Sequence, residues 1–322
     1  TWTFVTVSNN GIGIRADGTI WTWGTNTNGG HGQGAGVPAI SSPTQLGALT
    51  GWTHAWSNGT VCGAIRSGKL YMWGYNAFGS LGLGDTTTRS SPVQVGAQTD
   101  WAKISTGNGQ AVAGINTTGK LYVWGKNDFG KLGLGNTTYY SSPKQLGAQT
   151  DWLDVHVGQH WMLGLKTTGK LYAWGQNNTG QLGLGNITDY SSPKQIGALT
   201  DWASISHGTS NGWIHAIKTN GTLWGWGANG GGQLGNSAAV TRSSPVQIGA
   251  LTDWAQMVCS GGTFFGRKTD GTIWSCSYNN YGTKGNNTSG TGGYVSSPVQ
   301  VGALTTWTFL AGGNSAMLGI KT

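Results

Sequence analysis

The sequence has no glutamate and few charged residues of either sign. All ten acidic residues are aspartate, and charged residues make up 9% of the chain, against about 25% in an average globular protein. Without glutamate, the paired carboxylates of acid–base catalysis are hard to assemble. Several aspartates also recur in one turn sequence, TDW, which favours a structural role: Asp100, Asp151, Asp201 and Asp253. The sequence therefore predicts a protein that is not an enzyme.

Cysteine is scarce, and no metal-binding pattern is present. Cys62, Cys259 and Cys276 lack the spacing of metal ligands, so we expect buried thiols. A segment with one aspartate and two histidines, DVHVGQHW, could ligate a metal ion, but it occurs once and has no fourth ligand nearby, which favours a hydrogen-bonded loop. No segment is apolar enough to span a membrane, and no charged-then-apolar leader is present. We expect no cofactor, no metal ion and no membrane insertion.

Glycine and tryptophan are abundant instead. The chain of 322 residues contains 59 glycines and 18 tryptophans, and a disordered chain would avoid so many aromatic side chains. Strong helix formers are thin and no 3.6-residue apolar period occurs, so we expect an all-β fold. The net charge of +8 comes from lysines and arginines spread along the chain without any run. Scattered lysines commonly solubilise a surface, so a nucleic-acid partner is not favoured.

An internal repeat of about fifty residues organises the whole chain. Three markers recur in fixed order at intervals of 48 to 53 residues: a tryptophan after a Thr-rich turn, a tryptophan that closes an LYxWG segment, and the proline of SSP. The first marker falls at Trp2, Trp52, Trp101, Trp152, Trp202, Trp254 and Trp307. A period of this length is typical of a propeller blade or a solenoid rung.

Each repeat contains four segments that read as strands. In the third repeat they are WAKIS from Trp101, AVAGINTT from Ala111, KLYVWG from Lys120 and SPKQLG from Ser142. Gly, Asn and Asp fill the turn between the second and third segments, as a tight hairpin requires. The LYVWG segment has no polar alternation, which indicates a strand buried on both faces, as in the middle of a propeller blade.

The glycine-rich runs also match two nucleotide-binding patterns, but their context argues against such sites. In residues 164–171, GLKTTGKL, Leu171 stands where a P-loop needs serine or threonine, and a strand follows instead of a helix. Residues 230–235, GGGQLG, open no helix either. Turns in a repeated scaffold explain both runs.

The order WAxISxG, TTGKLYxWGxNxxGQLGLGN, SSPxQxG resembles the repeat of the regulator of chromosome condensation (RCC1) type of β-propeller. The resemblance implies a seven-bladed ring, and the very regular units are similar to propeller arrays of phage and environmental bacterial surface proteins. We expect one propeller over residues 1–322, with six full repeats that start near residues 2, 52, 101, 152, 202 and 254 and a partial seventh at 307–322. Six repeats of four strands plus two give 26 of the 28 strands of such a ring, so we expect one incomplete blade, closed by a missing or borrowed strand.

Loop residues that vary between the repeats are the candidates for partner binding, because a rigid frame commonly carries its function in loops. One set lies before SSP: Arg89, Tyr139, Tyr140, Tyr190, Arg242 and Tyr294. The other is expected where the first two strands join: Trp56, His160, Trp161, Trp213, Phe264 and Phe265. Tyrosine, tryptophan and arginine dominate interface energetics, although each of these residues could equally pack the end of a blade.

The sequence favours a structural or binding module over an enzyme. We expect contacts with a protein partner or with copies of the same chain, and glycan binding is the related possibility, because exposed Trp and Tyr suit sugar faces. A virion or extracellular location is favoured. The RCC1 resemblance implies a second function, guanine-nucleotide exchange with chromatin association, although the chain has no basic N-terminal tail and no long wedge-like insertion. A third possibility, which the resemblance also implies, is inhibition of a secreted enzyme.

Overall fold

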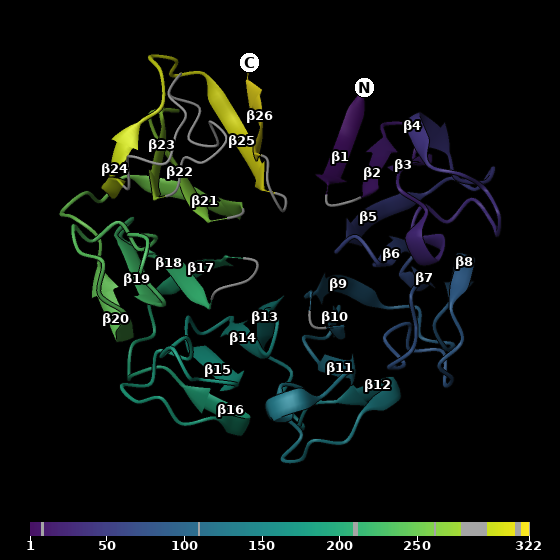
Figure 1. Ribbon diagram of the computed structural model, residues 1–322, viewed down its shortest axis with the longest axis horizontal. Helices are drawn as coiled ribbons and strands as arrows, with labels where there is room; N and C mark the ends of the chain where they lie inside the picture. The colour runs from purple at the N-terminus through teal and green to yellow at the C-terminus, as the bar shows by residue number, and fades with distance from the viewer. Residues whose placement is uncertain are drawn as a thin grey trace. The chain divides into compact units, whose positions relative to one another are not determined.

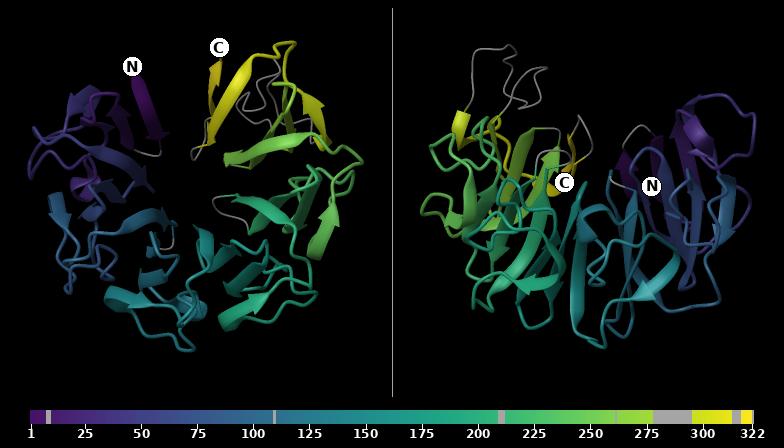
Figure 2. Two further views of the ribbon diagram at one scale, coloured as in Figure 1. Left: turned by 180° about the vertical axis from the view of Figure 1, so that it is seen from behind. Right: turned by 60° about the horizontal axis from the view of Figure 1, so that its bottom comes forward.

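The computed structural model describes residues 1–7, 10–108, 110–208, 212–260, 262–277, 295–312 and 317–321. The chain divides into two compact units, Thr1–His160 and Trp161–Thr322. The described residues of both units form antiparallel β-strands joined by turns and loops. Two short 3-10 helices occur in the first unit, η1 (Thr27–Gly29) and η2 (Asp128–Gly130). Figure 1 labels the strands, and Figure 2 shows the same sheets from two further directions.

The first unit contains three four-stranded sheets, each built from strands that follow one another in sequence. The first sheet consists of β1 (Trp2–Val7), β2 (Asn10–Arg15), β3 (Ile20–Gly24) and β4 (Ile40–Gln45). The second consists of β5 (Trp52–Ser57), β6 (Val61–Arg66), β7 (Lys69–Gly74) and β8 (Arg89–Gln94). The third consists of β9 (Trp101–Thr106), β10 (Ala111–Asn116), β11 (Leu121–Gly125) and β12 (Tyr140–Gln145), and the unit's last strand is β13 (Trp152–Val157).

The second unit repeats this arrangement. It begins with β14 (Trp161–Lys166), β15 (Leu171–Gly175) and β16 (Tyr190–Gln195), which pair in that order. Two complete sheets follow, made of β17 (Trp202–His207), β18 (Trp213–Lys218), β19 (Leu223–Gly227) and β20 (Arg242–Gln247), then of β21 (Trp254–Ser260), β22 (Thr263–Lys268), β23 (Ile273–Ser277) and β24 (Val295–Gln300). The final pair is β25 (Trp307–Gly312) with β26 (Met317–Lys321).

Strand positions follow the repeat that the sequence predicts. The first strand of each repeat begins at the first-marker tryptophan, and in the third repeat all four strands start within two residues of the expected segments. The Trp-Gly pair explains why the third strand stops. Gly125 has a φ of 93°, and a Cβ there would lie 2.5 Å from the carbonyl oxygen of Gln110. Only glycine fits this close approach, and the pairing of β11 with β12 shifts register at the same point.

Tryptophans of the third strands in the second to fifth repeats lie in the core, and Trp124 and Trp226 bond to the preceding repeat. Trp73, Trp124 and Trp226 are completely buried. The indole Nε1 of Trp124 donates a hydrogen bond to the Ser80 carbonyl of the preceding repeat at 2.9 Å, and Trp226 Nε1 donates to the Gln181 carbonyl at 3.0 Å. Burial of a large ring is thus combined with a satisfied polar atom, which fixes how neighbouring sheets pack.

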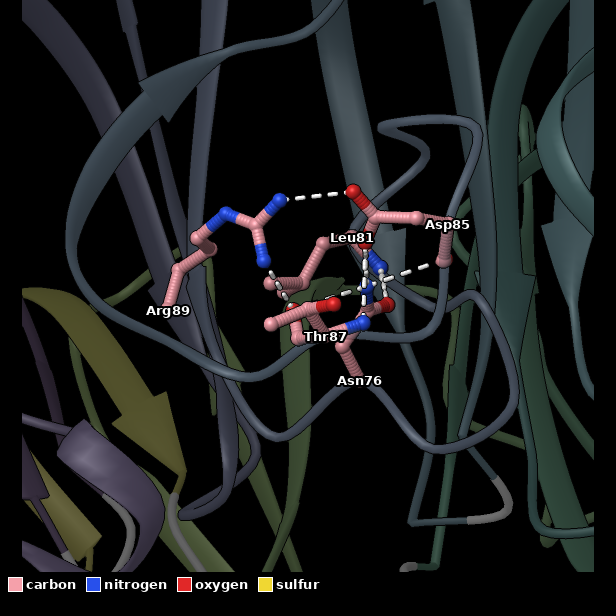
Figure 3. A network of polar contacts seen from close by, with 5 residues as sticks. All are labelled: Asn76, Leu81, Asp85, Thr87 and Arg89. Atoms are coloured by element: carbon pink, nitrogen blue, oxygen red, sulfur yellow. Dashed lines mark hydrogen bonds and ion pairs between the residues drawn. The ribbon is translucent and has the colours of Figure 1, made fainter.

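A buried asparagine clamps the long loop between the third and fourth strands in the second to fifth repeats. In the second repeat, Asn76 is completely buried, and its Nδ2 donates to the carbonyl oxygens of Asp85 and Thr87, both at 3.1 Å. Its Oδ1 accepts the Leu81 backbone N–H at 2.8 Å, and Arg89 pairs with the Asp85 carboxylate at 2.6 Å (Figure 3). Asparagines at the same position of later repeats are equally buried and accept the same leucine N–H: Asn127, Asn177 and Asn229.

The aspartates of the TDW turns stabilise the opposite end of the sheets. The Lys218 ammonium lies 3.3 Å from the Asp201 carboxylate and 4.3 Å from the centroid of the Trp224 ring. Lys268 repeats this arrangement with Asp253 and Trp274. Both lysines are 7% exposed in these pairs, so each ammonium replaces much of its hydration with a carboxylate and an aromatic face. This packing gives Asp201 and Asp253 a structural role.

Candidate binding surface

The structure separates the sequence-predicted site residues by burial. Exposed candidates are Tyr139, at 44%, and Arg242, and half-buried candidates are Arg89, Tyr140, Tyr190, Trp56 and His160. The side chains buried to 3% or less are Trp161, Trp213, Phe264 and Phe265. Tyr294 lies outside the described residues.

The four buried candidates lie in second strands and not in the loops where we expected them. Trp161 and Trp213 are the first residues of β14 and β18, and both phenylalanines are part of β22. Aromatic side chains at these positions pack between sheets. Phe264, for example, stacks on His215 with ring centroids 4.4 Å apart. They therefore add core packing and offer no exposed surface.

One candidate of the first unit, Tyr139, belongs to a group whose other members the sequence interpretation did not single out, and His160 adjoins this group. We call this group the aromatic–lysine patch and define it as Tyr75, Phe78, Lys126, Asp128, Phe129 and Tyr139. Its members come from the loops after β7 and β11 and from the residue before β12. The ring centroid of Phe78 lies 5.8 Å from that of Tyr139 and 6.3 Å from that of Tyr75. The patch is thus continuous across the second and third repeats.

A charged pair lies at the centre of the patch. The Lys126 ammonium is 2.8 Å from an Asp128 carboxylate oxygen and 4.8 Å from the centroid of the Phe78 ring. The Tyr139 hydroxyl donates a hydrogen bond to the other carboxylate oxygen of Asp128. The hydrogen bond to Asp128 raises the pKa of Lys126 and also raises the pKa of Tyr139. Near neutral pH, Lys126 is therefore a cation and Tyr139 a neutral hydrogen-bond donor.

The same contacts keep Asp128 ionised. Burial acts to raise the pKa of Asp128, but the hydrogen bonds from Lys126 and Tyr139 and the nearby positive charges outweigh it, so the pKa lies below its usual value. Both side chains of the ion pair are about one-quarter exposed, at 27% for Lys126 and 25% for Asp128. Solvent therefore screens this ion pair only in part. A partner that covered the patch would exclude solvent and strengthen the electrostatic attraction between Lys126 and Asp128.

Beside the ion pair, the backbone holds an aromatic ring outward in an unfavourable conformation. Phe129 has a φ of 59° and a ψ of 16°, a backbone conformation that residues other than glycine rarely adopt. Its ring is 43% exposed and lies 5.1 Å from the His160 ring, centroid to centroid. Such a conformation costs about 1 kcal/mol or more and persists only when its surroundings impose it.

A buried lysine supplies part of that support. Lys131 is completely buried, and its Nζ donates to the Gln159 carbonyl at 3.0 Å, which ties the loop that carries His160 to the loop that carries Phe129. Burial lowers the pKa of Lys131 to about 8. The pKa of His160 is lowered, first by burial and then by the positive charge of Lys131. His160 is thus a neutral ring near pH 7 and a suitable edge for the Phe129 contact.

Comparison of the repeats could have found the missed residues. The residue after the Trp-Gly pair differs in each of the first five repeats, as Thr25, Tyr75, Lys126, Gln176 and Ala228, while the clamp asparagine that follows it stays the same. A variable residue next to an invariant structural one indicates a side chain free to serve a contact. The two loop sets predicted from the sequence share only Tyr139 with the patch.

The described residues contain no group of three or more His, Cys, Asp or Glu side chains placed to hold a metal ion. In the segment DVHVGQHW, His156 Nε2 is 3.7 Å from an Asp154 carboxylate oxygen, and Lys103 lies 3.5 Å from the other oxygen. The three cysteines are buried, as expected, and burial raises the thiol pKa of Cys62 and of Cys259 to about 12. Within the described part of the chain, no helix is long and apolar enough to cross a membrane.

Known proteins share both the repeat and the fold. The family model for the regulator of chromosome condensation (RCC1) repeat matches residues 67–113, 118–164, 168–211 and 220–265. The ultraviolet-B receptor UVR8 of Arabidopsis thaliana is 30% identical over 245 residues, which is 74% of this chain and 43% of the receptor. The human E3 ubiquitin-protein ligase HERC2 is 30% identical over 155 residues, 45% of this chain and 3% of the ligase. The chain therefore spans less than half the length of these relatives.

Solved structures confirm the fold. The yeast RCC1 protein Prp20, in its complex with Kap60, superposes with a TM-score of 0.83 at 15% identity, covering all of this chain and 80% of Prp20. Human WBSCR16 superposes with a TM-score of 0.81 at 17% identity, covering 98% of this chain and 85% of that one. Identities this low inform on fold alone; the superpositions confirm the predicted all-β propeller and support about six to seven blades.

Proposed function

Because the chain belongs to the regulator of chromosome condensation (RCC1) repeat family, we propose that it is a non-enzymatic binding module that presents rigid loops to a protein partner. The observation that carries the proposal is the aromatic–lysine patch. It combines exposed rings with a charged pair, and its residues are specific to two repeats of an otherwise regular frame. Solved relatives support a binding role in general terms, since the structures of Prp20 describe binding to Gsp1p, to histones and to Kap60.

The composition of the patch suits a protein interface. Aromatic residues are enriched at protein interfaces, and tyrosine is among the residue types that dominate interface hot spots. The exposed rings of Phe129 and Tyr139, at 43% and 44%, are held by Lys131, the Asp128 hydrogen bond and the loop clamp, so little side-chain entropy is lost when a partner binds. The family frame supplies rigidity, and these side chains supply the contact.

We place this role in a virion or extracellular assembly, where the partner is another protein or a further copy of the chain. The low content of charged residues, the lack of glutamate and the close regularity of the repeats support this placement. A glycan is the other ligand class that exposed aromatic rings suit, because sugar rings stack on aromatic faces.

Co-sedimentation with virus particles or cell envelopes from the source material tests the proposal. The double variant Phe129→Ala/Tyr139→Ala should bind at least about tenfold more weakly, because two hot-spot rings are removed. Ile187→Ala is the matched control: it removes a side chain that is 66% exposed but lies outside the patch, and it should bind like the unmodified protein.

Each other outcome assigns a different function. Equal sedimentation of the double variant and the control would show that the patch is not the contact. Accelerated nucleotide release from a small GTPase would support an exchange factor instead, and stoichiometric inhibition of a secreted enzyme would support an inhibitor. Release of the protein from particles by free sugars would move the partner class from protein to glycan.

A further inference from the structure

A pocket of about 400 Å³ lies between the first two sheets of the first unit and shares no residue with the aromatic–lysine patch. Its walls are Leu46 and Trp52, both nearly buried, with Tyr71 and Pro92. Leu49 lies at its edge and is 49% exposed. A volume of this size, with mostly apolar walls and a few polar groups, is typical of a binding pocket.

The repeats themselves explain why the pocket is open here. Gln33 lines it, and the residue at the same place after GxLG is Leu83 in the second repeat and Leu184 in the fourth. Leu83 packs against the cluster that contains Trp101 and Tyr122. Leu184 packs in the same way against the cluster of the next repeat. In those repeats a leucine side chain therefore occupies the space equivalent to the one that is open beside Trp52 and Tyr71.

Hydrogen bonds keep Gln33 from filling the space. Its Nε2 donates to the Thr22 hydroxyl at 3.1 Å and to the carbonyl oxygens of Thr44 and Gln45 at 3.3 and 3.1 Å. Its backbone N–H donates to His31 Nδ1 at 3.2 Å, and His31 Nε2 bonds to the Pro38 carbonyl at 3.0 Å. The side chain is thus tied to the first sheet, and the apolar walls of the pocket stay accessible.

We propose that this pocket binds a branched aliphatic side chain of leucine size, carried by a peptide segment of a partner protein. The walls match those that hold leucine elsewhere in the chain. Gln33 and Ser91 also line the pocket, and an amide oxygen and a hydroxyl are groups that can accept hydrogen bonds from the N–H groups of a peptide backbone. The first repeat thus takes from a partner the side chain that other repeats supply themselves.

A titration with N-acetyl-L-leucine methylamide tests the pocket directly. Methyl NMR signals of Leu46 and Leu49 should shift in a saturable manner, with a Kd on the order of 1–10 mM for so small a ligand. N-acetylglycine methylamide, which has the same backbone and no side chain, should bind at least about tenfold more weakly. No saturable shift up to about 50 mM of the leucine compound, or equal shifts with the glycine compound, would overturn the proposal.

Two variants make the test specific. Gln33→Leu should fill the pocket as Leu83 does, abolish the leucine-dependent shifts at Leu46 and leave the protein at least as stable. Leu49→Ala changes only a half-exposed residue at the edge, so it should fold normally and bind about threefold or more weakly. Unchanged binding by folded Gln33→Leu protein, or by Leu49→Ala protein if the first variant does not fold, would show that the compound binds elsewhere.

Discussion

Replacing Asn76 with alanine removes a completely buried side chain that makes hydrogen bonds to three parts of one loop. The Leu81 residue is itself completely buried, so its backbone N–H would lose its acceptor without access to water. The carbonyl oxygens of Asp85 and Thr87 lie in partly exposed positions and can bond to water instead. The Leu81 N–H is therefore the group that has no substitute partner.

The size of the effect follows from these environments. A buried donor left unsatisfied costs about 1–3 kcal/mol, and each of the two carbonyl bonds contributes about 1 kcal/mol, so Asn76→Ala should destabilise the protein by about 3–5 kcal/mol. Asn26 provides an internal comparison. Its Nδ2 bonds to the Val37 carbonyl at 2.6 Å, but its Oδ1 has no hydrogen-bond partner among the described residues. Asn26→Ala should therefore cost clearly less.

Hydrogen exchange and urea denaturation measure this prediction together. The Leu81 amide of Asn76→Ala should lose at least about a hundredfold of its protection, while the Leu182 amide in the second unit should change little. In Asn76→Asp the new carboxylate keeps the acceptor for Leu81 but faces two carbonyl oxygens and Asp85, so its pKa should be raised. The loss of stability relative to the unmodified protein should therefore be smaller at pH 4 than at pH 7. A loss of stability below about 1 kcal/mol in Asn76→Ala, with normal Leu81 protection, would refute the clamp.

Three further predictions concern other parts of the frame. Burial holds the pKa of Lys131 near 8 in the folded protein, below its unfolded value of about 10.4, so the unfolded chain binds more protons between these two pH values. The free energy of unfolding, measured by urea denaturation, should therefore rise from pH 8 to 10. Lys131→Met should lose this rise. Lys218→Ala removes the ion pair with Asp201 and an aromatic contact, and should cost about 1–3 kcal/mol by the same measurement. Gly82→Ala places a Cβ 2.9 Å from Trp124 Nε1 at a residue whose φ is 71°. This change should lower the free energy of unfolding by about 2 kcal/mol or more and alter tryptophan fluorescence. An unaltered Tm would contradict the close packing.

The sequence alone predicted the fold well because the repeat supplies several independent copies of each signal. A tryptophan at the start of every first strand and Trp-Gly at the end of the third strand locate elements that a single copy would leave ambiguous. Positive φ angles at Gly68, Gly119 and Gly169 fit the hairpin turns expected from TGK and SGK.

The binding surface was harder to predict, because burial depends on contacts between sheets that no local pattern reveals. Trp213 and Phe264 look like exposed loop aromatics in sequence, yet both begin or lie within second strands and are completely buried. Lys131 shows the opposite case. A lysine is rarely buried unless it is paired, and only the structure shows that its Nζ reaches the Gln159 carbonyl of the next repeat.

The asparagine clamp has a consequence for how such a chain can change over generations. Asn76 and Asn127 bind their loops mainly through backbone atoms, at the same spacing in the second and third repeats. Substitutions of exposed side chains elsewhere in such a loop therefore leave these backbone contacts in place, so a repeat can acquire new surface chemistry while its loop keeps its shape. Each duplicated repeat held in this way supplies a preformed loop, so a new binding specificity can evolve in one loop while the others stay unchanged.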